Sequence, residues 1–226
     1  MHIVKILVMS IAVAACGSTE PARGEPSPQP PEKAPTEAPA ASGALFPVED
    51  VFTIAGRGTV VTGKVERGTI KLGDTLELIH GGQGRAVTVK GLDKFRAVVE
   101  QAGPGDVVGV LLQGVGRDEV ARGDVLATPG TLVARTALSA SIALLPSSEG
   151  GRKTPVFDGY RPMLVAWTAS VSATVALPAG RESLAPGEQA EVTITLQSPL
   201  PLELGTTFSL REGGRTVATG KVTGWR

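Results

Sequence analysis

The fold of this sequence is decided by residues 52–74, which read Phe52-Thr-Ile-Ala-Gly-Arg-Gly-Thr-Val-Val-Thr-Gly-Lys-Val-Glu-Arg-Gly-Thr-Ile-Lys-Leu-Gly-Asp74. Apolar and β-branched residues typical of strands lie between glycines at turn spacing. The apolar residues are Val60, Val61, Val65, Ile70 and Leu72, and the glycines are Gly56, Gly58, Gly63, Gly68 and Gly73. This pattern predicts a strand, a tight turn and a strand, and then a Gly-Asp turn into a strand over Thr75–Ile79. It is typical of the start of a small antiparallel barrel.

Strand-like segments continue through the rest of the chain. We expect further strands at 86–92, 107–112, 125–127, 135–145, 171–177, 190–196 and 207–211. In the segment 190–196, alternation of polar and apolar residues predicts one wet and one buried face. The amino-acid composition agrees with this prediction of many strands. The 226 residues include 29 glycines and 17 prolines, and only 4% are aromatic, which favours many short strands with turns over long helices.

The residue identities of the opening stretch are more specific for one protein family than its alternation of apolar residues and glycines. Gly-Arg-Gly-Thr-Val-Val-Thr-Gly at 56–63, with Val-Glu-Arg-Gly at 65–68, strongly resembles the opening of the second domain of bacterial elongation factor Tu, a translational GTPase. Val-Phe-Asp-Gly-Tyr-Arg-Pro at 156–162 resembles that family's third domain. The resemblance implies an all-β fold of two consecutive six-stranded antiparallel barrels, over 45–133 and 134–226. The sequence before Leu45 does not resemble the family's GTPase domain, so we expect that domain to be absent.

The N-terminal segment is expected to be a targeting signal over residues 1–15. A basic Lys5 precedes a short apolar run, which is too short to span a bilayer. The run ends Val13-Ala-Ala-Cys16, which resembles a bacterial lipoprotein signal in which the cysteine becomes the lipidated first residue. An ordinary signal peptide and a wrongly assigned start are the alternatives. Cys16 is the single cysteine, so no intrachain disulfide can form.

Residues 16–44 are expected to be a disordered tether behind this anchor. They contain seven prolines after Cys16 and almost nothing apolar beyond alanine, the prolines being Pro21, Pro26, Pro28, Pro30, Pro31, Pro35 and Pro39. Such a segment cannot bury enough surface to fold, and its prolines keep it extended. A Pro-rich recognition peptide is the alternative. We therefore expect a protein anchored by lipid in the bacterial cell envelope. An Asp directly after the lipidated cysteine would direct retention in the inner membrane. Because Gly17 stands there instead, the sequence slightly favours the outer membrane as the location of the protein.

Several functions are excluded at this level. The formal net charge is +0, so there is no basic field for nucleic acid. Gly58–Lys64 fits G-x-x-x-x-G-K, but Val65 follows where a phosphate loop needs Ser or Thr, so we expect no GTP and no cofactor. His2 and His80 are poorly placed, and no nucleophile–base pair, zinc-ligand spacing or paired carboxylates is evident. We expect neither an enzyme nor a metal site.

The resemblance also implies where RNA would bind. In the family, the first barrel receives the aminoacylated 3′ end of tRNA, and the matching positions are Asp50, Phe52, Thr62, Asp93, Arg96, Leu111 and Arg122. Arg96 would pair a phosphate, and Asp93 would accept from a ribose hydroxyl. The ordinary alternative is that Phe52 and Leu111 pack in the barrel and that both charges form surface pairs. Val107 departs from the family, where Asn is common.

In the family, the second barrel touches the T-stem of tRNA. The matching positions here are Arg152, Thr154, Arg161, Gly213, Gly214, Arg215 and Thr216. Lys153 and Trp167 depart from the family, which has His and Arg there. We interpret the run 163–167 as packing, with a new contact surface as the alternative. Residues 212–215 are expected to form a hairpin turn.

Two functions follow. The first is an exported, lipid-anchored binding module whose partner is an unidentified envelope protein or ligand. The alternative is a translation protein that binds aminoacyl-tRNA without GTPase activity. Resemblance of fold does not by itself carry function.

Overall fold

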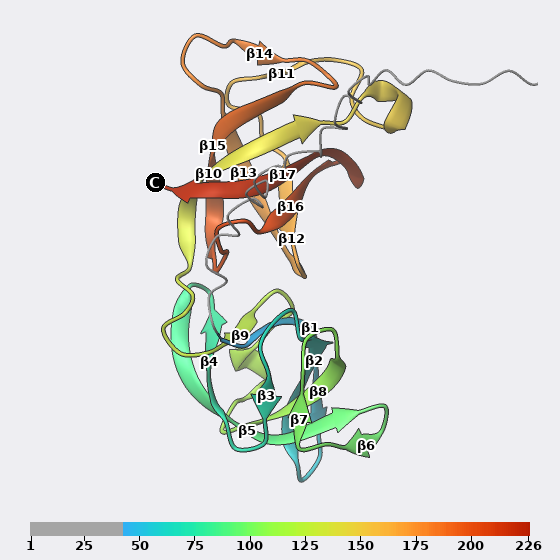
Figure 1. The fold of residues 1–226 in the computed structure, drawn as a ribbon, viewed down its shortest axis with the longest axis vertical. Coiled ribbons are helices and arrows are strands. Elements are labelled where there is room, and N and C mark those ends of the chain that lie inside the picture. Colours follow the sequence, from blue (N-terminus) through green and yellow to red (C-terminus); the bar gives the residue numbers. More distant parts are fainter. Residues whose placement is uncertain (1–42) are drawn as a thin grey trace, which may run out of the picture. The chain divides into compact units, whose positions relative to one another are not determined.

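The computed structural model describes residues 43–226, whose strands form two barrels (Figure 1). The predictions for the signal, for the lipidated Cys16 and for the Pro-rich tether lie outside these residues. No helix in the described part of the chain has the length and apolar character needed to cross a membrane.

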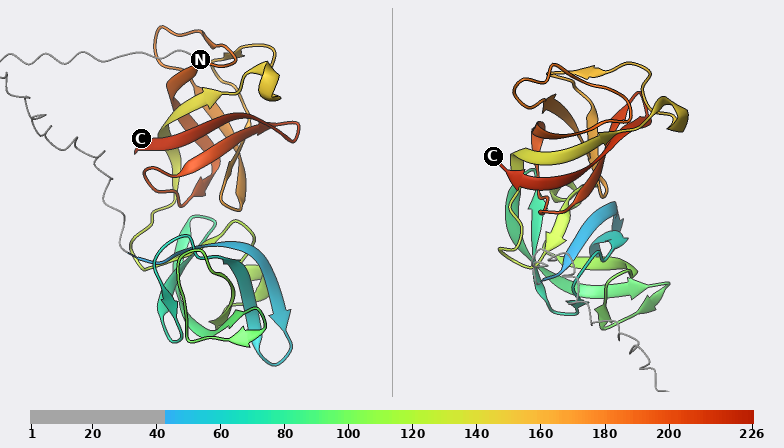
Figure 2. Two further views of the ribbon diagram at one scale, coloured as in Figure 1. Left: turned by 45° about the vertical axis from the view of Figure 1, so that its right-hand side comes forward. Right: turned by 45° about the horizontal axis from the view of Figure 1, so that its top comes forward.

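The first barrel consists of six antiparallel strands in the order β4-β9-β1-β2-β8-β5, closed by pairing of β5 with β4. The left view of Figure 2 looks into this ring. The strands are β1 (Leu45–Ile54), β2 (Gly58–Lys64), β4 (Thr75–His80), β5 (Gln83–Lys94), β8 (Val107–Gln113) and β9 (Val125–Ala127). Closure leaves no open sheet edge in the ring itself, as expected from the sequence.

Short elements decorate this barrel. β6 (Ala97–Val98) extends the sheet beyond β5, β3 (Ile70–Lys71) pairs with β7 (Gln101–Ala102), and a 3-10 turn, η1 (Arg117–Glu119), precedes β9. The expectation that Val65 and Leu72 are strand residues is wrong, and for Val65 the reason is that β2 already ends at Lys64. β3 ends at Lys71, and Leu72 lies in the following turn with its side chain exposed, because the chain already bends toward Gly73 there.

The second barrel also has six antiparallel strands, in the closed order β10-β15-β13-β12-β16-β17. They are β10 (Arg135–Leu144), β12 (Met163–Ala166), β13 (Ala169–Ala176), β15 (Gln189–Leu200), β16 (Thr207–Glu212) and β17 (Arg215–Trp225). A two-stranded ribbon of β11 (Val156–Phe157) and β14 (Ser183–Leu184) and a 3-10 turn, η2 (Ser147–Glu149), complete it. The prediction of two six-stranded antiparallel barrels is confirmed.

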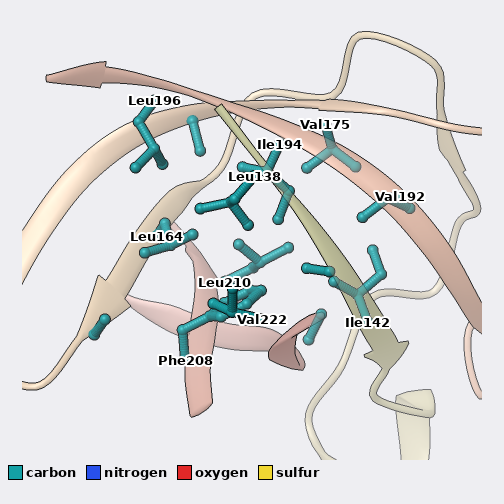
Figure 3. Packing of buried hydrophobic residues seen from close by; sticks show 14 of the residues in the cluster. Leu138, Ile142, Leu164, Val175, Val192, Ile194, Leu196, Phe208, Leu210 and Val222 are labelled. Carbon is teal, nitrogen blue, oxygen red and sulfur yellow. The ribbon is translucent and has the colours of Figure 1, made fainter. Parts of the chain in front are cut away.

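Each barrel is filled by the inward side chains of its own strands. In the second barrel these are aliphatic residues and Phe208, packed around Leu138 and Leu210 (Figure 3). Along β15, Val192, Ile194 and Leu196 are buried while the residues between them face outward, which confirms the predicted alternation. The first barrel has a separate core of aliphatic residues and Phe46, and this core includes Ala44, one residue before the predicted start of the domain. Burial of these apolar faces stabilises both barrels.

One glycine of the opening stretch is required by a close approach of the backbone. A Cβ on Gly63 would lie 2.2 Å from the carbonyl oxygen of Pro47 and 3.1 Å from the ring of Phe46. β1 and β2 pair beside this point, where the register shifts between Val48 and Asp50. Only a residue without a side chain lets the two strands come this close.

Candidate functional site

The register of four neighbouring strands brings most of the predicted first-barrel residues onto one outer face. Asp50 on β1 pairs with Thr62 on β2, Thr62 pairs with Gly109 on β8, and Gly109 pairs with Asp93 on β5. A second row follows two residues along each strand and consists of Phe52, Val60, Leu111 and Gly91. Together these eight residues are called the Gly91/Gly109 face below. Residues far apart in the sequence thus meet in two adjacent rows.

Two glycines form a low floor in this face. A Cβ on Gly109 would meet the side chains of Val60, Thr62 and Asp93 at 3.3, 3.8 and 3.9 Å. A Cβ on Gly91 would meet the side chain of Leu111 at 3.4 Å. The larger side chains therefore stand around the two glycines, and a ligand can approach the sheet backbone between them.

Apolar side chains are exposed around this floor. Leu111 is only 8% exposed, as the packing interpretation predicts, but Phe52 is 53% exposed, so for Phe52 that interpretation is wrong. Its ring lies on the outer face of β1 rather than among the inward side chains of the barrel. Val107, two residues before Gly109, and Val98, which pairs with Asp93, are also exposed. Exposed apolar groups gathered in one region mark an interaction surface.

The turn between β5 and β6 is conformationally strained. Lys94 pairs with Ala97, so Phe95 and Arg96 form a two-residue turn, and both have left-handed backbones with φ of 49° and 68°. Residues 43–226 contain two more hairpin turns of this kind, and both consist of glycines, Gly81–Gly82 and Gly213–Gly214. A two-residue turn with positive φ at both positions favours Asn or Gly, and a bulky residue there is an outlier. The Phe95 ring is nevertheless 86% exposed.

The charges near the face are mixed in sign. Asp93 lies 3.9 Å from Arg57, and Lys94 forms an ion pair of 2.7 Å with Asp106. The hydrogen bond from Lys94 is the largest cause that lowers the pKa of Asp106 below its usual value. Asp93 therefore forms the expected surface pair, with Arg57 as its partner. Within residues 43–226 Arg96 forms no ion pair, so for Arg96 the expectation of a surface pair is wrong.

The remaining member of the predicted set lies apart. Arg122 is in the loop before β9 and donates a hydrogen bond of 3.3 Å to the backbone carbonyl of Glu49, one residue before Asp50. Residues 43–226 contain no group of three or more His, Cys, Asp or Glu side chains arranged to hold a metal ion.

In the second barrel, Arg152, one of the predicted tRNA contacts, already bonds to other side chains of the protein. Its guanidinium forms an ion pair with Glu212, donates to the hydroxyl of Thr154 at 3.2 Å, and lies 5.2 Å from the ring centre of Tyr160. The hydroxyl of Tyr160 donates to the same Glu212 carboxylate at 3.1 Å. The hydrogen bond with Glu212 is the main cause that raises the pKa of Arg152, and burial is the main cause that raises the pKa of Tyr160.

This cluster makes a testable contribution to stability. The hydrogen bond from Arg152 lowers the folded-state pKa of Glu212 below its usual 4.5, so the stabilisation is present above that pH and is lost as pH falls through the lowered value. Because Glu212 is half exposed, we expect Glu212→Gln to cost under about 1 kcal/mol at neutral pH, and this cost should shrink as the pH falls below the usual pKa of a glutamate. Denaturant unfolding at neutral pH and below that pKa measures this. The exposed Glu182→Gln is the control, and an equal pH dependence for both variants would contradict the assignment.

The other second-barrel candidates flank this cluster. Gly213 and Gly214 form the predicted hairpin turn between β16 and β17, and Arg215 and Thr216 start β17. Arg161 and Lys153 are exposed.

Trp167, where the family has a charge, packs against the second-barrel core and also against a small cluster, in agreement with the packing interpretation. That cluster consists of Leu45, Ile79, Val125, Ala127 and Leu132.

Sequence reasoning missed the two floor glycines and the strained turn. Gly91 and Gly109 look like ordinary strand glycines, and only the cross-strand register shows that they adjoin. The turn of Phe95 and Arg96 was missed because neither residue is one of those that usually mark a turn in a sequence.

Residues 58–127 match the model of elongation factor Tu domain 2, and residues 131–225 match the model of the elongation factor Tu C-terminal domain. Six of the eight residues of the Gly91/Gly109 face lie within the first match, Asp50 and Phe52 precede it, and the Arg152 cluster lies within the second match.

Proposed function

The chain belongs to the elongation factor Tu family through two of that protein's domains, and from this premise we propose that it is a non-catalytic binding module, exported and held by lipid in the bacterial envelope. Its ligand binds on the Gly91/Gly109 face and contacts the adjoining turn of Phe95 and Arg96. Export and anchoring rest on the lipoprotein-like Val13-Ala-Ala-Cys16 and the Pro-rich segment behind it.

The strained turn is the observation that carries the proposal. A bulky residue in the left-handed region costs about 1–3 kcal/mol, and such strain is concentrated at functional sites. The other two hairpin turns of the same geometry avoid this cost with Gly–Gly pairs. At 95 and 96 the chain instead presents an aromatic ring, 86% exposed, and a guanidinium at the edge of the face. A gain in binding explains why this costly pair is present.

The chemistry of the face favours a protein as the ligand. Exposed Phe95, Val98 and Phe52 supply apolar contact area, while Arg96, Asp50 and Asp93 supply charges of both signs. An aromatic and arginine anchor beside a mixed polar rim is the usual composition of a protein interface. The proposed partner is therefore a protein of the same envelope compartment.

The translation alternative is favoured by one observation. Asp50, Phe52, Thr62, Asp93 and Leu111, all expected from the family to surround the aminoacylated end of tRNA, do share one face. Against it stand the formal net charge of +0, which leaves little affinity from counterion release, and the occupation of Arg152 by Glu212. The protein ligand is therefore preferred.

The proposal predicts that relieving the turn stabilises the protein. The double change Phe95→Asn with Arg96→Gly supplies residues that this turn geometry favours, so we expect the free energy of unfolding to rise by about 1–3 kcal/mol. Denaturant unfolding of the full-length chain measures it. Gly81→Asn, in a turn that is already relaxed, is the matched control and should change stability by only a few tenths of a kcal/mol. A loss of stability in the double variant would show that this turn stores no strain.

A further inference from the structure

A hollow lies on the outer surface of the second barrel, far along the sequence from the Gly91/Gly109 face. It is a groove of about 830 Å³ that crosses β10, β17, β16 and β12, a volume typical of small-molecule sites. Its floor consists of two cross-strand rows, Ser141–Lys221–Thr207 and Ala143–Thr219–Ser209–Val165. We call it the Thr207/Thr219 groove.

Three of the four hydroxyl groups of this floor are available to a ligand. Thr207, Ser209 and Thr219 come from adjacent strands and donate to no other residue in the part of the chain that the structure describes. By contrast, the hydroxyl of Ser141 in the first row accepts a hydrogen bond of 2.8 Å from Gln189, and at the rim Thr223 donates to Glu191 at 3.0 Å. The rim is therefore held in place, while three hydroxyls in the floor can each donate and accept one or more hydrogen bonds.

An aromatic side chain bounds one end of the groove. Trp167 occupies the turn between β12 and β13, and its backbone has a left-handed φ of 49°. After Phe95 and Arg96, it is the third residue other than glycine with positive φ among those described. A bulky residue in this conformation is costly, which is an observation independent of the hydroxyls.

We infer that the Thr207/Thr219 groove binds an oligosaccharide. Hydroxyls that both donate and accept match the hydroxyls of sugars, and the indole of Trp167 offers an apolar surface for a sugar ring. A peptide strand is disfavoured, because the closed barrel offers no free edge for main-chain pairing. A nucleic acid is disfavoured, because Lys221 is the single cation lining the groove and one cation cannot follow a phosphate backbone.

Lys221 further specifies the sugar. It lies in the middle of the first row, between Ser141 and Thr207. An ammonium at this position favours a ligand with an acidic sugar, since a carboxylate can pair with it without crowding the hydroxyls of the second row. The inference goes beyond the proposed function and uses a different face, so either can fail without the other.

The test is a titration of the full-length protein with three defined probes, namely chitotetraose, cellotetraose and tetragalacturonate. In a Trp225→Phe background the fluorescence of Trp167 reports binding, because the chain has two tryptophans. We expect saturable binding in the millimolar range or tighter, strongest for tetragalacturonate. Thr207→Val with Thr219→Val removes two hydroxyls at constant shape and should weaken binding about tenfold.

Matched variants distinguish a loss of binding in the groove from a general effect of the substitutions on the protein. Thr193→Val with Thr195→Val makes the same change on β15, outside the groove, and should leave affinity unchanged. Lys221→Gln should weaken tetragalacturonate and spare the two neutral probes. Absence of saturable binding for all three probes up to about 20 mM would overturn the inference. Equal affinity in the wild type and in the Thr207→Val, Thr219→Val variant would also overturn it.

Discussion

Gly63→Ala should lower the free energy of unfolding by about 3 kcal/mol, which is at the upper end of the usual cost of overpacking. The added methyl would lie 2.2 Å from the carbonyl oxygen of Pro47, which belongs to the backbone of β1 and cannot rotate away. The ring of Phe46, fully buried, closes the other side at 3.1 Å. β1 would have to move away from β2, and the ladder that carries Asp50 and Phe52 would be disturbed. Chemical denaturation of the full-length chain measures the loss.

Gly103→Ala is the matched control in the same barrel. Nothing lies within 4 Å of a Cβ on Gly103, and its backbone is not left-handed. At a site of this kind, Ala in place of Gly stabilises by about 0.4–1 kcal/mol, because it restricts the unfolded chain. The two substitutions should therefore differ in sign. If Gly63→Ala unfolds at the same denaturant concentration as Gly103→Ala, the close approach at Gly63 does not constrain the barrel.

Cys16→Ser should move most of the protein from the membrane fraction to the soluble fraction. The proposed anchor is a set of acyl chains on this cysteine, and two or more chains hold a protein to a bilayer far more firmly than one. Serine keeps the size of the side chain but lacks the thiol that would be lipidated. The structure describes residues 43–226, and no helix among them is long and apolar enough to span a membrane. Fractionation of cells that express the full-length chain makes the measurement.

Ser18→Ala, two residues further on, is the control and should leave the protein in the membrane pellet. Labelling with a radioactive fatty acid provides a second readout, which should be positive for the wild type and for Ser18→Ala. Retention of Cys16→Ser in the pellet at the wild-type level would refute the anchor. It would leave the Gly91/Gly109 face unaffected, because that face depends only on residues 50–111.

The fold was predictable because its signals are local. Alternation such as that of Val192 and Ile194 with the outward residues between them repeats every two residues, and the glycines that separate such segments mark the turns. Leu72 shows the limit of this reasoning, since an apolar residue beside Gly73 was assigned to a strand although it lies in a turn. Nothing local distinguishes a short strand end from the first turn residue.

The candidate face was predictable only in part. The family resemblance supplied Asp50, Thr62 and Asp93, but their adjacency depends on the pairing of four strands, which is not local. The exposure of Phe52 was mispredicted for the same reason, since an aromatic residue on a strand has equal chances of facing either side until the register is known. The Thr207/Thr219 groove has no signal at all in the sequence, because its two rows join residues of four strands.

The most direct test of the proposed binding site is photo-crosslinking from Phe95, the exposed ring in the turn that adjoins the Gly91/Gly109 face. Phe95 is replaced by p-benzoylphenylalanine in the full-length chain, and cells are irradiated before extraction. Phe157, 63% exposed on β11 of the second barrel, is the matched control position. The proposal predicts a discrete crosslinked product with one envelope protein from position 95 and none from position 157. Crosslinks to tRNA from position 95, or the same products from both positions, would contradict it.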